Sequence, residues 1–98
     1  MIFNIEFDER ALKEWQKLDK TIQEQFKKKL KQLQNNPHIK ALRLSGDLSN
    51  CYKIKLQTSG FRLIYQVINE EIVILVIAIG KREDKKVYGT ANTRLNKT

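Results

Sequence analysis

The sequence predicts a small single α+β domain, residues 1–98, with an antiparallel sheet of about four strands, an N-terminal helical hairpin on one face and a short C-terminal helix. Apolar residues recur at helical spacing between residues 9 and 33. Three segments rich in β-branched and aromatic residues follow between residues 51 and 79. A chain of 98 residues with 41% hydrophobic content is long enough for one core and too short for two.

The N-terminal segment predicts a strand followed by a helix. Residues 2–7 alternate between apolar and polar side chains, which is typical of a half-buried strand. Asp8 stands where a helix N-cap is expected, and the helix predicted over residues 9–18 has acidic residues in its first turn. The side chains expected to face the core are Phe3, Ile5 and Phe7 of the strand and Ala11, Leu12, Trp15 and Leu18 of the helix.

A second helix is predicted from about Asp19 to the breaker sequence at residues 35–37. Thr21 and Glu24 have the spacing of a capping box. The expected core stripe consists of Ile22, Phe26, Leu30 and Leu33. The other side is rich in lysine; such a run is most often a solvated face, and direct contact with a polyanion is the alternative. The lysines concerned are Lys27, Lys28, Lys29 and Lys31.

The second half of the chain predicts an antiparallel meander of strands over residues 51–56, 61–68 and 72–79, with a further short edge strand near Leu42. The last two strands are apolar on both sides, whereas the two helices cover only one face of a sheet. The other face is therefore expected to be partly filled by a ligand or covered by another polypeptide. Residues 88–95 are expected to form the C-terminal helix or to stay partly mobile.

The charge of the chain indicates a polyanionic partner. The 19 Lys and Arg residues against 11 Asp and Glu give a net charge of +8, and residues 25–68 hold nine of the basic residues with a single acid. The longest apolar run, residues 72–79, is too short to span a membrane, and the N-terminus lacks signal-peptide features. We therefore expect a cytoplasmic protein without membrane contact.

Cys51 and His38 are each the only residue of their type. A single cysteine excludes an internal disulfide, and an isolated Cys or His is a poor candidate for a metal ligand. We therefore expect structural roles for both residues, and no metal or other cofactor.

Three basic residues are expected to meet on one sheet face. If the hairpin closes on residues 57–60, Lys55 lies opposite Arg62, and alternation places Lys53 on the same side. Directly opposed like charges destabilise a strand pair, so an anionic ligand such as a phosphate would compensate them. The alternative is that the long side chains extend around an edge or pair with Asp47 or Glu70.

The sequence resembles the RelE toxins of bacterial toxin–antitoxin systems over nearly its whole length. The resemblance is carried by FDERALKEWQKLDKTIQEQFKKKLKQLQNNPHIKALRLSG, CYKIKLQTSGFRLIYQVI and VIAIGKREDKKVYGTA. It implies a small α/β fold and an endoribonuclease that cuts messenger RNA in the ribosomal A site. It also implies a cognate RelB-like antitoxin, and a toxin–antitoxin complex that represses its own operon at operator DNA.

The resemblance also implies the site residues. The family's strand lysines match Lys53 and Lys55, and the arginine of its SG[FY]RL motif matches Arg62. Its GKRE and VY motifs match Arg82 and Tyr88. Lys81 is kept as well, whereas Lys85 and Lys86 stand in a spacer that is often less basic in the family, so local RNA affinity is expected to differ.

Cleavage through the RNA's own 2′-hydroxyl needs a base, positive charge around the phosphorane and an acid for the leaving oxygen, and no metal. Neighbouring positive charge disfavours the charged form of a lysine, which suits Lys55 to act as the base. Lys53 and Arg62 would stabilise the phosphorane, and Arg82 would protonate or stabilise the leaving group. Tyr88 would stack on or orient a base, or else pack on the sheet.

Two other functions remain open. The related ParE toxins share this architecture, inhibit DNA gyrase and generally lack the basic set, so Lys53, Lys55, Arg62 and Arg82 argue against that function. A non-catalytic module that binds RNA or the ribosome is also compatible with the charge.

Overall fold

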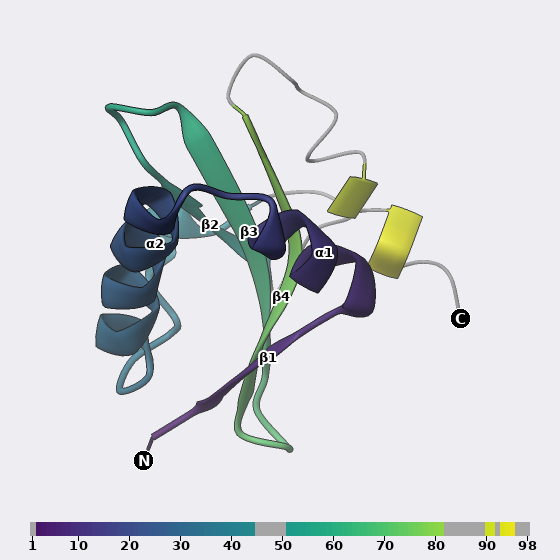
Figure 1. The fold of residues 1–98 in the computed structure, drawn as a ribbon. Helices are drawn as coiled ribbons and strands as arrows, with labels where there is room; N and C mark the ends of the chain where they lie inside the picture. The colour runs from purple at the N-terminus through teal and green to yellow at the C-terminus, as the bar shows by residue number, and fades with distance from the viewer. Residues whose placement is uncertain (1, 45–50, 82–89, 92, 96–98) are drawn as a thin grey trace.

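The computed structural model describes residues 2–44, 51–81, 90–91 and 93–95. In chain order the elements are β1 (Asn4–Phe7), α1 (Glu9–Gln16), α2 (Lys20–Leu33), the short 3-10 helix η1 (Lys40–Leu42), β2 (Cys51–Lys55), β3 (Phe61–Ile68) and β4 (Val73–Lys81). The described residues beyond position 89 are helical, and they lie across the sheet from α2 (Figure 1). The predicted α+β fold class is confirmed. None of the described helices is long and apolar enough to cross a membrane.

The sheet has four strands in the order β1-β4-β3-β2. Strands β2, β3 and β4 form the predicted antiparallel meander. Strand β1 runs parallel to β4, with backbone hydrogen bonds of 2.9 Å from Asn4 to Ile72 and from Asp8 to Val76. The sheet is therefore mixed and not wholly antiparallel. Alternation of side chains fixes which face of a strand is buried, but it carries no information about the direction of the neighbouring strand.

Helices α1 and α2 both start where the sequence predicts, but the capping predicted for α2 differs. The Asp8 side chain caps α1 by accepting a 2.9 Å hydrogen bond from the backbone N–H of Arg10. Hydrogen bonding by the Arg10 side chain also lowers the pKa of the Asp8 carboxyl. Helix α1 ends at Gln16, and α2 begins right after Asp19, whose side chain makes no capping hydrogen bond. The predicted capping box is therefore wrong, since it would need a helix that begins two residues later.

The main core lies between the helices and one face of the sheet. From the helices it contains Ala11, Trp15, Phe26, Leu30 and Leu33, with Leu18 and Ile22 partly buried against it. Leu12 was expected in this stripe but is 40% exposed. Helix α1 has only eight residues and packs on β4 through a narrow i, i+4 contact, so the next residue along points to solvent.

The opposite face of the sheet is covered in part by the chain's own C-terminal helix. A second buried cluster joins Cys51, Ile64, Ile77, Ala78 and Ala91, with Leu44, Leu75 and Leu95 packed against it. Ala91 is completely buried. The expectation that a ligand or another polypeptide is needed over this part of the face is therefore wrong, because the C-terminal segment supplies the apolar cover.

Two side chains close the part of the β4 edge that β1 leaves open. Strand β1 pairs with β4 only as far as Val76. Beyond it, Arg94 donates a 2.6 Å hydrogen bond to the carbonyl of Ile77, and Glu14 accepts one of 3.2 Å from the backbone N–H of Ile79. Arg94 and Glu14 also form an ion pair at 2.8 Å. This arrangement satisfies edge groups that would otherwise be available for pairing with another strand.

The connection from α2 to β2 contains less strand than expected. The segment near Leu42 is the 3-10 helix η1, and strand-like pairing is limited to an isolated bridge between Arg43 and Tyr52. The backbone N–H of Leu44 donates a 2.9 Å hydrogen bond to the carbonyl of Cys51. The chain therefore runs alongside only the first half of β2.

Aromatic residues of the sheet hold the segment between α2 and β2 in place. The Tyr65 hydroxyl donates a 2.9 Å hydrogen bond to the buried carbonyl of Pro37, and burial raises the pKa of Tyr65. The Tyr65 ring stacks on Tyr52 at a centroid distance of 5.3 Å. The two ring nitrogens of His38 contact the Tyr52 hydroxyl at 2.8 Å and the Asn69 side-chain oxygen at 2.7 Å. These contacts give His38 the structural role expected from the sequence.

The substitution Tyr65→Phe is expected to lower the free energy of unfolding by about 1–2 kcal/mol, because the buried Pro37 carbonyl loses its donor. Urea unfolding followed by the fluorescence of Trp15, the only tryptophan, measures this change. Lys17→Ala, at an exposed position, should change stability by less than about 0.5 kcal/mol. Equal stability of Tyr65→Phe and the unmodified protein would contradict a stabilising role for this bond.

Candidate active site

The β2–β3 hairpin has the predicted register. Lys55 pairs with Arg62, and Lys53 pairs with Ile64 two residues along. The loop at residues 57–60 closes the hairpin, with Leu56 donating a 2.9 Å hydrogen bond to the carbonyl of Phe61. The expected juxtaposition of Lys55 and Arg62 is therefore present.

All three basic residues lie on the sheet face opposite α1 and α2. Cys51 and Ile64 belong to the cluster on that face, and alternation along the two strands places Lys53, Lys55 and Arg62 with them. Their neighbours in sequence, including Ile54 and Leu63, pack in the core on the helix side. Each of the three is half-buried, and the guanidinium Nε of Arg62 is itself buried.

A glycine leaves room beside this basic trio, Lys53, Lys55 and Arg62. On its other side Arg62 pairs with Gly80 of β4. Because glycine has no side chain, Gly80 itself places no atoms beyond the backbone next to the Arg62 side chain. The sequence interpretation did not single out Gly80, because a register shift between Ile64 and Tyr65 brings it opposite Arg62, where an unbroken register would place Ile79.

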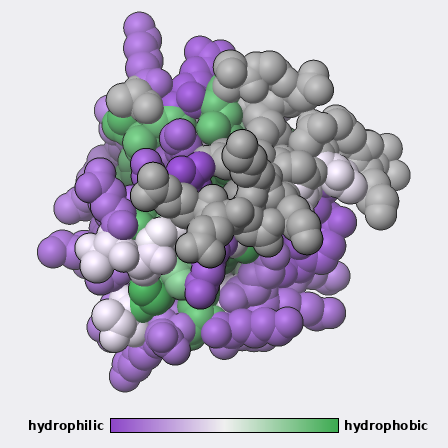
Figure 2. Space-filling view, turned by 90° about the horizontal axis from the view of Figure 1, so that it is seen from above, coloured by the Kyte–Doolittle hydropathy of each residue, from purple (hydrophilic) through white to green (hydrophobic). Residues whose placement is uncertain are grey.

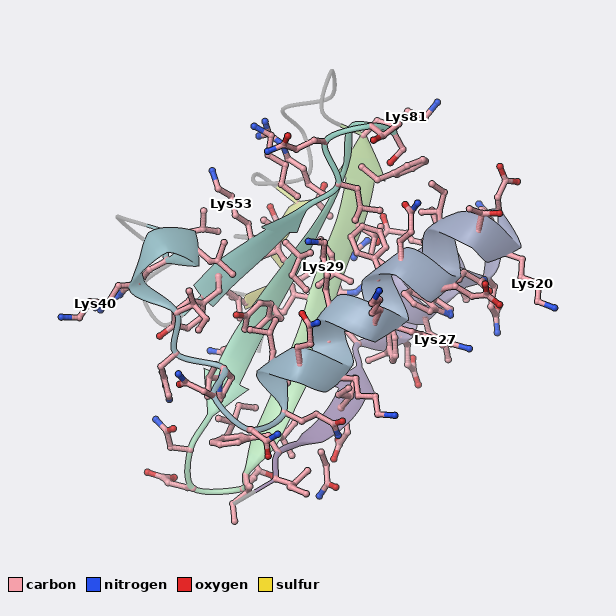
Figure 3. The ribbon with its side chains drawn as sticks, turned by 90° about the vertical axis from the view of Figure 1, so that its left-hand side faces the viewer. Lys20, Lys27, Lys29, Lys40, Lys53 and Lys81 are labelled. Carbon is pink, nitrogen blue, oxygen red and sulfur yellow. The ribbon has the colours of Figure 1, made fainter. Side chains whose placement is uncertain are left out.

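Lys81 lies apart from the basic trio. It pairs with Phe61, and its ammonium group sits 5.5 Å from the centre of that ring. Phe61 packs against the core on the helix side, so Lys81 belongs to the other face of the hairpin. Figure 3 shows Lys81 at the end of the strand, extending outward.

The other predicted residues divide into two groups. The lysines at positions 27, 28, 29 and 31 are exposed on α2, as a solvated face requires. The remaining residues, Arg82, Lys85, Lys86 and Tyr88, lie outside the described part of the chain. Figure 2 views the molecule from above. Among the coloured residues, hydrophilic side chains lie around most of the outline, and hydrophobic side chains lie between them.

The arrangement of the basic trio suits an anion. Lysine and arginine are hydrogen-bond donors with positive charge, and arginine binds phosphate oxygens in a two-pronged geometry. Within the described residues, no cluster of three or more His, Cys, Asp or Glu side chains that could hold a metal ion is found. The lysine and arginine side chains of the basic trio can supply charge stabilisation, and lysine can also transfer a proton.

Cys51 lies on the same face but is completely buried. Burial raises the pKa of its thiol to about 11 from a usual value of 9.0. At pH 8 the folded protein is expected to react with a thiol reagent about 100-fold more slowly than the unfolded chain, because less thiolate is present. The reaction rate should rise with pH until the thiol has titrated. Stopped-flow labelling in buffer and in denaturant measures the ratio, and equal rates would contradict the burial.

The chain matches a family of known toxins. Residues 5–86 match the family described as "ParE toxin of type II toxin-antitoxin system, parDE". Among curated proteins, the chain is 57% identical to "Putative RelE-like toxin protein" of Escherichia coli and 53% identical to "mRNA interferase toxin RelE" of Escherichia coli strain K12. Each alignment covers 97% of this chain and 99% of the relative. These names agree with the enzyme class expected from the sequence.

Solved structures give the same result. A mutant of E. coli toxin RelE in the free state superimposes with a TM-score of 0.89 at 52% identity, covering 97% of this chain and 99% of that one. The toxin in the intact E. coli RelBE toxin–antitoxin complex superimposes with a TM-score of 0.78 at 54% identity, covering 81% of this chain and 95% of that one. The chain therefore belongs to the ParE toxin family of type II toxin–antitoxin systems, on its RelE branch.

Proposed function

We propose that this protein is a toxin that inhibits translation by cutting messenger RNA within codons in the ribosomal A site. The observation that carries the proposal is the basic trio, with Lys55 directly opposite Arg62 on one sheet face. A relative that is 53% identical is named an mRNA interferase toxin. The ribosome and the messenger RNA place the site of action in the cytoplasm.

The reaction proposed is attack of the 2′-hydroxyl on the adjacent phosphate. Lys55 accepts the hydroxyl proton, while Lys53 and Arg62 stabilise the negative charge of the phosphorane. Arg82 stabilises or protonates the leaving 5′-oxygen, and Tyr88 orients or stacks on an unstacked base. The cations supply the charge that a metal ion provides in other nucleases, so the reaction is proposed to need no cofactor.

Dependence on the ribosome follows from this small set of groups. The ribosome would hold the codon in a geometry in which the 2′-oxygen is in line with the leaving oxygen, which the toxin does not impose alone. The basic surface would dock on ribosomal RNA by counterion release. The residues proposed to bind RNA, either of the ribosome or of the message, are Lys27, Lys28, Lys29, Lys31, Lys81, Lys85 and Lys86.

The proposed protein partner is a RelB-like antitoxin. The solved E. coli toxin that superimposes on this chain is also known in a complex with its antitoxin. We propose that a RelB-like antitoxin binds and inhibits this chain, and that the complex represses its own operon by binding operator DNA.

Mapping of 5′ ends on translated messenger RNA after brief expression tests the proposed activity. New ends inside codons should appear and should be lost when translation initiation is blocked. Gyrase inhibition, the function of ParE toxins, predicts DNA supercoiling defects without new RNA ends, and a non-catalytic ribosome-binding module predicts neither. New ends that persist in untranslated RNA would contradict the role of the ribosome.

A further inference from the structure

The lysine run on α2 divides between two sides of the helix. Gln25, Lys28, Lys29 and Gln32 follow the spacing i, i+3, i+4, i+7 and therefore form one stripe. All four line a groove that runs between α2 and the end of β2, whereas Lys27 and Lys31 are absent from its lining. In Figure 3, Lys29 extends from α2 on the side of Lys53, and Lys27 extends to the other side of the helix.

The groove has two adjoining parts, of about 450 Å³ and about 390 Å³. They share Lys29, Gln32, Lys55 and Gln57, so they form one continuous depression. Among the residues that the structure describes, the lining contains no acidic and no aromatic side chain. Its lysines are Lys28 and Lys29 from α2 and Lys53 and Lys55 from β2.

The groove adjoins the candidate active site at the sheet edge. Strand β2 is the last strand of the sheet, so Lys53 and Lys55 stand on the rim between the catalytic face and the groove. Because Leu56 donates its backbone N–H to Phe61, alternation directs the backbone N–H of Lys55 away from β3. The groove thus offers ammonium, amide and backbone donors in one place.

We propose that this groove, named here the α2–β2 groove, holds the sugar–phosphate backbone of the RNA strand as it leaves the catalytic face around the edge of β2. Its four lysines, with no acidic residue among the described residues of the lining, form a site for consecutive phosphates. No described lining residue is an aromatic platform on which a base could stack, so the proposed contact is with the backbone and is independent of base sequence. The inference rests on the proposed function, since it extends the RNA path from the reacting phosphate.

An acidic peptide fits the groove less well. A peptide strand would bind by pairing with the free edge of β2. Residues 43 and 44 already lie along the first half of that edge. The backbone N–H of Leu44 donates a hydrogen bond to the carbonyl of Cys51, and Arg43 forms an isolated β-bridge with Tyr52. The remaining edge is too short for a stable strand pair, whereas single phosphates need only local donors.

Binding of a fluorescent 2′-O-methyl RNA dodecamer tests the α2–β2 groove, since this RNA lacks the attacking hydroxyl and stays intact. Anisotropy titrations at several salt concentrations give the slope of log affinity against log salt. The double variant Lys28→Gln/Lys29→Gln should reduce the magnitude of this slope by about 1.4, because each lost single-strand phosphate contact removes about 0.7. The matched control Lys17→Gln/Lys20→Gln, which removes the same charge at exposed positions outside the groove, should leave the slope unchanged.

The variant Lys27→Gln/Lys31→Gln distinguishes RNA binding in the α2–β2 groove from RNA binding spread over all the lysines of α2. The inference is supported if the salt slope of this variant changes by less than half as much as that of Lys28→Gln/Lys29→Gln, and if both variants keep the melting temperature of the unmodified protein. Equal losses in both variants, or no loss in either, would overturn it. Binding of a polyglutamate peptide that depends on Lys28 and Lys29 while RNA binding does not would overturn it in favour of a protein partner. Codon cleavage that survives loss of Arg62 would refute the proposed reaction and leave this binding result standing.

Discussion

Replacing Arg62 by Ala is expected to reduce codon cleavage by about 10²–10³-fold, the cost of removing one preorganised charge from a phosphorane. Arg62 lies directly between Lys55 of β2 and Gly80 of β4, at the centre of the candidate site. Its guanidinium is the one group of the basic trio that binds two phosphate oxygens at once. The rate at which cut ends appear on stalled ribosomes in a reconstituted translation system measures the effect.

Two further variants show whether the loss is specific. Arg62→Lys keeps the charge but not the two-pronged geometry, so it should restore only part of the rate. Lys40→Ala removes an exposed cation on η1, away from the basic trio, and should cleave at the normal rate. Antitoxin binding and melting temperature should be retained in all three. Cleavage by Arg62→Ala at near the normal rate would show that the reacting phosphate binds elsewhere.

The hairpin that carries the site could be predicted from the sequence alone. A four-residue loop between two strands of clear alternation leaves one register that buries the apolar side chains, so Lys55 has to face Arg62. Apolar spacing on α2 predicted Phe26, Leu30 and Leu33 as core residues for the same reason. Such local periodicity depends only on the geometry of one element or of one tight connection.

Features that depend on distant contacts could not be predicted. The parallel pairing of β1 with β4 joins residues nearly 70 positions apart, and nothing within residues 2–7 specifies it. The cover of the second face comes from Ala91 and Leu95, which stand in a polar segment with little apolar content. The ion pair of Arg94 with Glu14 holds this C-terminal segment in position, and it joins residues near opposite ends of the chain.

The distribution of the α2 lysines over two sides of the helix could have been predicted from the sequence. Treating Lys27 to Lys31 as one basic run hides the helical period, which separates Lys28 and Lys29 from the other two. The sequence does not say which of the two lysine pairs lies next to β2. That depends on how the apolar stripe of α2 packs on the sheet, because its orientation determines where both sides of the helix point. The basic trio and the groove lysines then become two parts of one surface joined at β2.

Replacing Lys55 by Ala is expected to reduce codon cleavage by about 10²–10⁴-fold, the usual contribution of a general base. Lys55 is the lysine directly opposite Arg62, which is why we propose it as the group that takes the proton from the 2′-hydroxyl. Lys53→Ala should have a smaller effect, because Lys53 is proposed to contribute charge only. Single-turnover cleavage on stalled ribosomes measures both rates.

Arginine substitutions distinguish a base from a charge. Arg stays protonated in proteins, so Lys55→Arg keeps the positive charge of the site but removes the proton acceptor. Lys55→Arg should therefore be nearly as slow as Lys55→Ala, whereas Lys53→Arg should retain most of the rate. If Lys55→Arg cleaves at a rate close to that of the unmodified protein, Lys55 serves as a charge like its neighbours. The proton would then have to pass to another group or to water, with the basic trio acting through electrostatics alone.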